Sequence, residues 1–214
     1  MRILLVFSLL FCAVSVNARA QTAWRHSQGA FAVTVPAGWE EAEGRVPVSG
    51  ERQLAIQSQA MRENRLPPPT VFIRECSIGR TFHADMQETQ AELNAKFEDG
   101  QLLSFLITMA MPTTEHSRGN EIVDGVRVIS YDIDIEPSRG LLASMGRVMQ
   151  PDVQIPDVGP VRLMLRMFIV PEPEGSAQYI LVCQATQVAE AADDIAAMTA
   201  FLASLAINSD LGAQ

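Results

Sequence analysis

The residues best suited to chemistry in this 214-residue chain are few and scattered. Its only histidines are His26, His83 and His116; His83 lies two positions before an aspartate, and His116 directly follows Glu115. Neither spacing matches the helical H-E-x-x-H motif or a Cys/His zinc site. We therefore expect no metal site. We interpret His83 as a solvated residue at a helix start and His116 as part of a polar loop over residues 113–120.

The sequence contains no local motif for a serine hydrolase or for nucleotide binding. The chain has no G-x-S-x-G elbow, which is the usual mark of a serine hydrolase, and no G-x-G-x-x-G or G-K-[ST] phosphate loop. A Ser-His-Asp triad takes its members from distant parts of a sequence, so a small hydrolase that uses His83 or His116 stays open as an alternative. We expect no catalytic residue and no cofactor, and a non-enzyme is the favoured interpretation.

A pair of aspartates, Asp132 and Asp134, could serve acid–base chemistry. These residues alternate with apolar residues, as in a strand with one buried and one solvated face. We therefore interpret them as solvent-facing positions. Arg162 or Arg166, on the polar side of a later strand, could pair with them across the sheet, at about 0.2–1 kcal/mol for each pair.

Methionine is frequent, and a Met-rich surface suits adaptable apolar binding. Core filling is the ordinary explanation, but a carrier of an apolar ligand stays open as a second alternative. The methionines considered for it are Met109, Met111, Met145, Met149, Met164 and Met167.

The first twenty residues have the pattern of a secretory signal peptide. Met1-Arg2 gives a positive start, residues 3–16 are almost wholly apolar, and the segment ends in an A-x-A cleavage site. The apolar run is shorter than the roughly twenty residues that a membrane span needs. We expect cleavage between Ala20 and Gln21, a periplasmic or secreted protein, and no membrane span in the mature form.

Two cysteines remain after cleavage, Cys76 and Cys183. Cys12 leaves with the signal, and bulky Phe11 before it disfavours a lipid-modified cysteine. An even pair in an oxidising compartment favours one disulfide, and both residues lie in strand-like runs that could approach each other. Two separate buried thiols are the alternative. The spacing is not that of a redox-active C-x-x-C pair.

The charge of the chain excludes one class of partner. Removal of Arg2 and Arg19 with the signal changes the formal net charge from −9 to −11. Nucleic-acid binding needs a basic surface, and anionic membranes repel an acidic one. Net negative charge keeps a secreted protein soluble and monomeric, so we expect a monomer that binds neither nucleic acid nor anionic membranes.

Periodicity predicts an α+β fold with a mainly antiparallel central sheet flanked by helices. We expect one domain over residues 21–208 and a frayed tail at 209–214. Strands are predicted at 29–35, 52–58, 71–76, 121–123, 129–136, 161–169 and 179–183, with a hairpin turn at Asp124-Gly125. Helices are predicted from Asp85, with Glu88 completing a capping box, to Gly100 and from Glu190 to Ala206, followed by a short closing strand.

One segment does not fit this regular pattern. Residues 137–160 are rich in proline and glycine around an apolar stretch. A connection of this length inside a compact domain is usually functional, mobile or home to an unrecognised element. We predict a short helix or a flap there, which is also our first choice for a lid over any ligand.

The two ends of the mature chain resemble a known family. Phe31-Ala32-Val33-Thr34-Val35-Pro36-Ala37-Gly38-Trp39 is similar to the opening "F-x-V-x-x-P-x-G-W" of Mog1/PsbP-like exported bacterial domains, and the closing strand–helix–strand order is similar as well. The resemblance implies an antiparallel sheet sandwiched by helices and a binding, assembly or accessory role. It carries over no catalytic residues, and a shared fold does not transfer a function.

These observations together predict an exported, non-catalytic accessory or binding protein with a possible envelope protein as its partner. A histidine bonded to a serine and a carboxylate in a cleft would favour the hydrolase. A cavity lined by methionine and leucine would favour the carrier. A filled core would favour the binding module.

Overall fold

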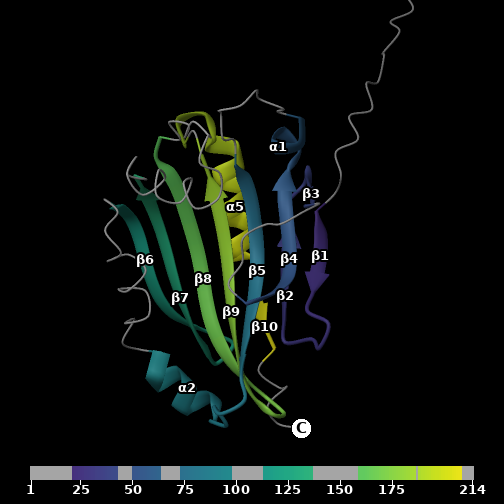
Figure 1. The fold of residues 1–214 in the computed structure, drawn as a ribbon, viewed down its shortest axis with the longest axis vertical. Coiled ribbons are helices and arrows are strands. Elements are labelled where there is room, and N and C mark those ends of the chain that lie inside the picture. Colours follow the sequence, from purple (N-terminus) through teal and green to yellow (C-terminus); the bar gives the residue numbers. More distant parts are fainter. Residues whose placement is uncertain are drawn as a thin grey trace, which may run out of the picture.

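Two antiparallel sheets and one long helix form the body of the protein (Figure 1). The computed structural model describes residues 21–42, 50–63, 73–97, 113–136, 159–186 and 188–208. The larger sheet has the strand order β3-β4-β5-β9-β8-β7-β6, and the smaller has the order β1-β2-β10. The α+β class and the mainly antiparallel sheet expected from the sequence are confirmed, since every neighbouring pair of strands is antiparallel.

The element bounds follow the chain in this order. The strands of the smaller sheet are β1 (Thr22–Arg25), β2 (Phe31–Val35) and β10 (Ala206–Ile207). Those of the larger are β3 (Trp39–Glu41), β4 (Glu51–Ser58), β5 (Arg74–His83), β6 (Thr113–Val123), β7 (Val126–Ile135), β8 (Val161–Glu172) and β9 (Gly175–Ala185). The helices are α1 (Gln59–Glu63), α2 (Gln90–Lys96), a 3₁₀ turn at Val188–Glu190 and α5 (Ala192–Ala203).

The central pair of strands, β5 and β9, joins residues far apart in the sequence. Its register runs without a break from Arg74 opposite Ala185 to His83 opposite Ser176. Cys76 and Cys183 lie opposite each other in this register and are joined in a disulfide with an Sγ–Sγ distance of 2.04 Å. This is the pairing that the cysteine count favoured, and both side chains are fully buried.

The larger sheet is packed on both faces. On one face, α5 and the smaller sheet cover a core that includes Phe31, Phe168, Tyr179 and Phe201. On the other face, a second cluster forms from buried residues of β7 and β8, with Phe97 at the end of α2 packed against it. Alternate residues of β7 therefore point to different environments, which explains the regular alternation of its sequence.

The first helix begins later than the sequence indicated. Asp85 and Glu88 have the spacing of a capping box, but Asp85 lies in the turn that follows β5. The box forms instead at Thr89, whose hydroxyl accepts from the Glu92 amide while the Glu92 carboxylate accepts from the Thr89 amide at 2.8 Å. Both pairs have the same three-residue spacing. Sequence alone therefore did not distinguish them, and the prediction of a helix start at Asp85 is wrong.

The polar loop predicted around His116 is also wrong, because residues 113–123 form β6. This strand pairs with β7 across the predicted Asp124-Gly125 turn, whose two residues have φ of 49° and 83°. It lies at the edge of the larger sheet and is exposed along almost its whole length. It therefore lacks the apolar alternation by which a strand is recognised.

Several expectations fall outside the described residues. These are the signal segment ending at Ala20, most of the 137–160 segment, the tail at 209–214, and four of the methionines: Met109, Met111, Met145 and Met149. The region that the structure describes contains no helix long and apolar enough to cross a membrane.

The disulfide should contribute strongly to stability, because it closes a span of 107 residues in the unfolded chain. We expect the Cys76→Ala/Cys183→Ala variant to lose about 2–5 kcal/mol of unfolding free energy in urea titrations. Wild-type protein treated with a reductant in urea should lose a similar amount, and the double variant should not respond to the reductant. Equal midpoints for oxidised wild type and the double variant would contradict this expectation.

Candidate functional site

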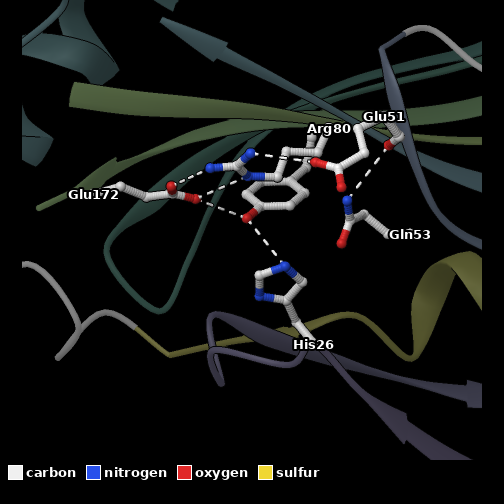
Figure 2. A network of polar contacts seen from close by, with 6 residues as sticks. His26, Glu51, Gln53, Arg80 and Glu172 are labelled. Carbon is white, nitrogen blue, oxygen red and sulfur yellow. Dashed lines mark hydrogen bonds and ion pairs between the residues drawn. The ribbon is translucent and has the colours of Figure 1, made fainter. Parts of the chain in front are cut away.

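A chain of polar contacts connects the two sheets at one end of the molecule (Figure 2). His26 lies in the turn between β1 and β2, Arg80 on β5, Glu172 at the end of β8 and Tyr179 on β9. Glu51 at the start of β4 completes the group. Because these residues come from five separate elements, no local pattern in the sequence indicated the network.

Arg80 is the centre of the network. Its Nε donates to Glu172 Oε1 at 3.2 Å, and its Nη2 donates to Glu172 Oε2, so the guanidinium holds the carboxylate with two parallel hydrogen bonds. On its other side, Nη1 lies 3.5 Å from Glu51 Oε2 (Figure 2). A two-point arginine–carboxylate contact is geometrically more specific than a single ion pair.

The network passes from Glu172 to His26 through Tyr179. The Tyr179 hydroxyl donates to Glu172 Oε1 at 2.9 Å and lies 3.4 Å from His26 Nε2. A phenol has one proton to give, and Glu172 accepts it. In this arrangement His26 Nε2 carries a hydrogen and donates to the phenol oxygen.

Aromatic rings surround His26, which is 4% exposed. Its ring stacks on Phe31 at 5.3 Å between centroids and meets the edge of Tyr179 at 5.2 Å. Burial lowers the pKa of His26 more than the neighbouring Glu172 carboxylate raises it. Because burial dominates, the imidazole stays neutral over a wider range of pH than in water.

Tyr179 and Arg80 are each held in one protonation state. Burial, followed by the nearby Glu172 carboxylate, raises the pKa of Tyr179, so its hydroxyl keeps the proton. Hydrogen bonds to Glu172 raise the pKa of Arg80, so the guanidinium stays charged. A general base or nucleophile needs a pKa moved toward the working pH. The network therefore has the properties of a structural connection between the sheets.

A second polar group lies on the face of β6, β7 and β8 next to α5. Arg162 donates to Asp132 Oδ1 from Nη1 at 2.8 Å, and its Nε lies 2.8 Å from Asp134 Oδ1. His116 Nε2 lies 2.8 Å from Asp134 Oδ2. Arg166 pairs instead with Glu121 of β6 at 3.1 Å. The expected cross-strand pairing is thus present for Arg162, and no serine hydroxyl joins His116 among its described contacts.

Beside these ion pairs lies a small cleft of about 150 Å³ between α5 and the sheet. Ser117, Ser130, Asp132 and Arg166 give it polar groups. Apolar groups come from Met164 and Leu165 of β8 and from Leu202 of α5. Neither serine hydroxyl has a hydrogen-bond partner within the described part of the chain. The cleft therefore offers free hydrogen-bonding groups next to apolar side chains.

The remaining candidates are dispersed. His83 ends β5 opposite Ser176 and takes part in neither group among the described side-chain contacts. Met164 and Met167 lie in the cores on opposite faces of the larger sheet, so these two do not line one apolar cavity. Within the described residues, no three His, Cys, Asp or Glu side chains are placed to hold a metal ion.

Comparison with known proteins shows that this chain is similar to solved structures in fold and not in sequence. No family model matches the chain, and no curated protein matches it in sequence. Among solved structures, it is similar to PsbP of the cyanobacterium Synechocystis sp. PCC 6803, with a TM-score of 0.47 at 7% identity over 93% of this chain and 99% of that one. The Ran-binding protein Mog1p of Saccharomyces cerevisiae gives 0.45 at 9% identity, covering 88% and 95%.

LpqN of Mycobacterium tuberculosis, described as involved in cell envelope biogenesis, gives a TM-score of 0.47 at 10% identity, covering 88% of this chain and 91% of its own. The fold-level resemblance to Mog1/PsbP-like proteins that the sequence suggested is confirmed. At such low identity it is a likeness of fold alone.

The neutral, buried His26 makes stability depend on pH. In the unfolded chain an imidazole titrates near about 6.5, above its lowered folded-state pKa. Between those values the unfolded chain binds more protons, so the unfolding free energy is fully present above about pH 6.5 and falls as the pH drops toward the folded pKa. Urea titrations from pH 7.5 to 5.5 should show a smaller slope for His26→Phe than for wild type, and His83→Gln is the matched control. An unchanged slope in His26→Phe would contradict the assignment.

The Tyr179 hydroxyl should contribute measurably to the unfolding free energy. Tyr179→Phe leaves a buried His26 N–H without an acceptor and removes a donor from Glu172, which should cost about 1–3 kcal/mol. Tyr131→Phe is the matched control, because Tyr131 is also a buried residue and its hydroxyl has no hydrogen bond among the described residues. Thermal and urea unfolding should separate the two variants clearly. Equal losses for both would show that the network contributes nothing through this hydroxyl.

Proposed function

We propose that this chain is an exported accessory protein that binds a partner protein in the periplasm or outside the cell and catalyses no reaction. The observation that carries the proposal is the cleft beside α5, with its two free serine hydroxyls and its apolar side chains. A site of this kind can accept a group from another molecule.

The volume of the cleft suits one side chain of a partner protein better than a small-molecule ligand. Pockets for small-molecule ligands typically occupy roughly 300–1,000 Å³, whereas this cleft has about 150 Å³. Protein interfaces commonly centre on a few residues that fill small, well-packed pockets. A lining that mixes apolar side chains with hydroxyls suits a side chain that has an apolar body and a polar end.

The charges around the cleft favour binding over catalysis. Asp132 and Asp134 both engage Arg162, and His116 Nε2 lies 2.8 Å from Asp134, so each of these carboxylates already has a partner. A catalytic pair needs one group free to give or take a proton at the reacting atom. Paired charges around a cleft are common at the rim of an interface, where they contribute specificity and orientation.

The proposed location outside the cytoplasm is supported by the disulfide. Cys76 and Cys183 are joined in the core of the sheet, and such structural bonds persist mainly in oxidising compartments. The signal-like first twenty residues point to the same compartment. The possible partner is therefore sought among proteins of the envelope.

Site-specific photo-crosslinking in intact cells tests this proposal. A photoreactive amino acid at Ser130, in the cleft, should give a discrete crosslinked band with a partner protein. The same group at Gln28, exposed in the β1–β2 turn, should not give that band. Leu202→Trp, which fills the cleft from the α5 side, should lower the crosslink yield from Ser117 at least severalfold. Identical patterns from Ser130 and Gln28, or no crosslink at any position, would contradict a binding role for this face.

A further inference from the structure

The outer edge of β6 is the part of the larger sheet best placed to pair with another chain. The strand is last in the sheet order, and no strand of the described residues lies beyond it. Ile122 is 54% exposed, which makes it one of only two large hydrophobic side chains exposed in the described region. An exposed apolar residue on an unpaired edge promotes aggregation unless the edge is protected or used.

The turn geometry shows which backbone groups face outward. A two-residue turn with positive φ at both Asp124 and Gly125 closes on a hydrogen-bonded pair, Val123 and Val126. Hydrogen-bonded and non-hydrogen-bonded pairs then alternate along an antiparallel ladder. The N–H and C=O groups of Ile122, Asn120 and Arg118 therefore point away from β7.

The two halves of β6 are protected differently. The ladder is irregular between Glu115 and Ser117, where His116 is the extra residue. Bulges of this kind protect sheet edges by twisting the strand out of register. From Ser117 to Val123 the register is regular. The half next to the hairpin turn is thus the half that can accept a new strand.

The side chains of this half define the chemistry of a complementary strand. Arg118 and Ile122 lie on the face opposite α5, where the Arg118 guanidinium stacks 5.2 Å from the Tyr131 ring centre. Glu121 lies on the α5 face, pairs with Arg166 and is still half exposed. An added strand matches this edge when it places an acid opposite Arg118, a base opposite Glu121 and an apolar residue opposite Ile122.

We infer that β6 binds its partner by strand addition, with an extended, antiparallel segment of the partner pairing along Arg118–Ile122. This inference rests on the proposed binding function and specifies its partner. Read from its N-terminus, the segment has an apolar residue, then a basic one, and an acidic one three positions after the base. Main-chain hydrogen bonds provide affinity in this mode of recognition, and the alternating side chains provide specificity.

A blocked peptide, Thr-Val-Lys-Thr-Thr-Glu-Thr, reproduces this pattern and is the probe. In fluorescence polarisation with the full mature chain it should bind about tenfold more tightly than the same peptide with Lys and Glu exchanged, because both charge pairs become repulsive after the exchange. Arg118→Glu should reduce or reverse that preference. Equal binding of the two peptides would overturn the inference.

The backbone contribution has its own test. Asn120→Pro removes one outward N–H, and proline is tolerated where the N–H of an edge strand faces solvent. It should abolish binding of the matched peptide, whereas Asn120→Ala, which keeps the N–H, should not. Methylation of the peptide nitrogen opposite Asn120 gives the same loss without altering the protein, so a folding defect of the proline variant cannot mimic the result.

The outcomes separate this inference from the proposed function. If the crosslink from Ser130 persists unchanged in Asn120→Pro, and the matched and exchanged peptides bind alike, strand addition is wrong while binding through the cleft stands. If the peptides discriminate but no cellular partner crosslinks at any position, the edge is confirmed as a binding surface and the proposed cleft-centred function is wrong.

Discussion

The antiparallel pairing of β5 with β9 is the constraint on which the rest of the structure depends. It brings residues 74–83 against residues 176–185 along a continuous register. Pairing residues so far apart in sequence costs loop-closure entropy before any contact compensates for it. The Cys76–Cys183 disulfide lies inside this pairing and reduces the freedom of the unfolded chain at that point.

Both ends of the β5–β9 pair carry a buried polar connection to another element. At one end, Arg80 and Tyr179 join Glu172 and His26 and so tie the β1–β2 turn to the larger sheet. At the other end, Arg74, which is 1% exposed, lies 3.2 Å from Asp194 of α5. Buried charges of this kind need every partner in place. The two connections therefore fix where the small sheet and the helix sit.

The Arg162 ion pairs near β6 are about as sheltered as the Arg80–Glu172 pair. The Arg162 side chain is 14% exposed and that of Asp134 is 19% exposed, against 18% for Arg80 and 9% for Glu172. His116 and Glu121 are more exposed, at 35% and 50%, and ion pairs in contact with solvent add little stability. These outer pairs arrange charge beside the cleft and the strand edge that we propose for binding.

A feature of the fold could be predicted from the sequence when the residues that determine it are neighbours in the chain. The Asp124-Gly125 turn and the alternation along β7 are local patterns, and both were recognised. The even cysteine pair restricted the disulfide to one choice once the signal was set aside. The edge strand β6 was missed because an exposed strand needs no apolar face. The His26 network was missed because its members meet only after all of the strands have paired.

The candidate site shows the same limit. His83 and His116 attracted attention through their neighbours in sequence, yet the described contacts give His83 no polar side-chain partner and give His116 a carboxylate partner from the next strand. His26, whose surroundings in sequence are unremarkable, is the histidine that packs in the core. Ser117 and Ser130 gain significance only because β6 and β7 place them in one cleft with α5.

The central claim is that an oxidised β5–β9 pair holds together a binding protein that acts outside the cytoplasm. Intact-mass measurement on the chain recovered from fractionated cells, with thiols trapped by alkylation at the moment of lysis, tests it most directly. The account predicts an envelope or secreted fraction that begins at Gln21 and takes up two alkyl groups only after reduction. A cytoplasmic chain that begins at Met1 and has Cys76 and Cys183 already alkylated would contradict it.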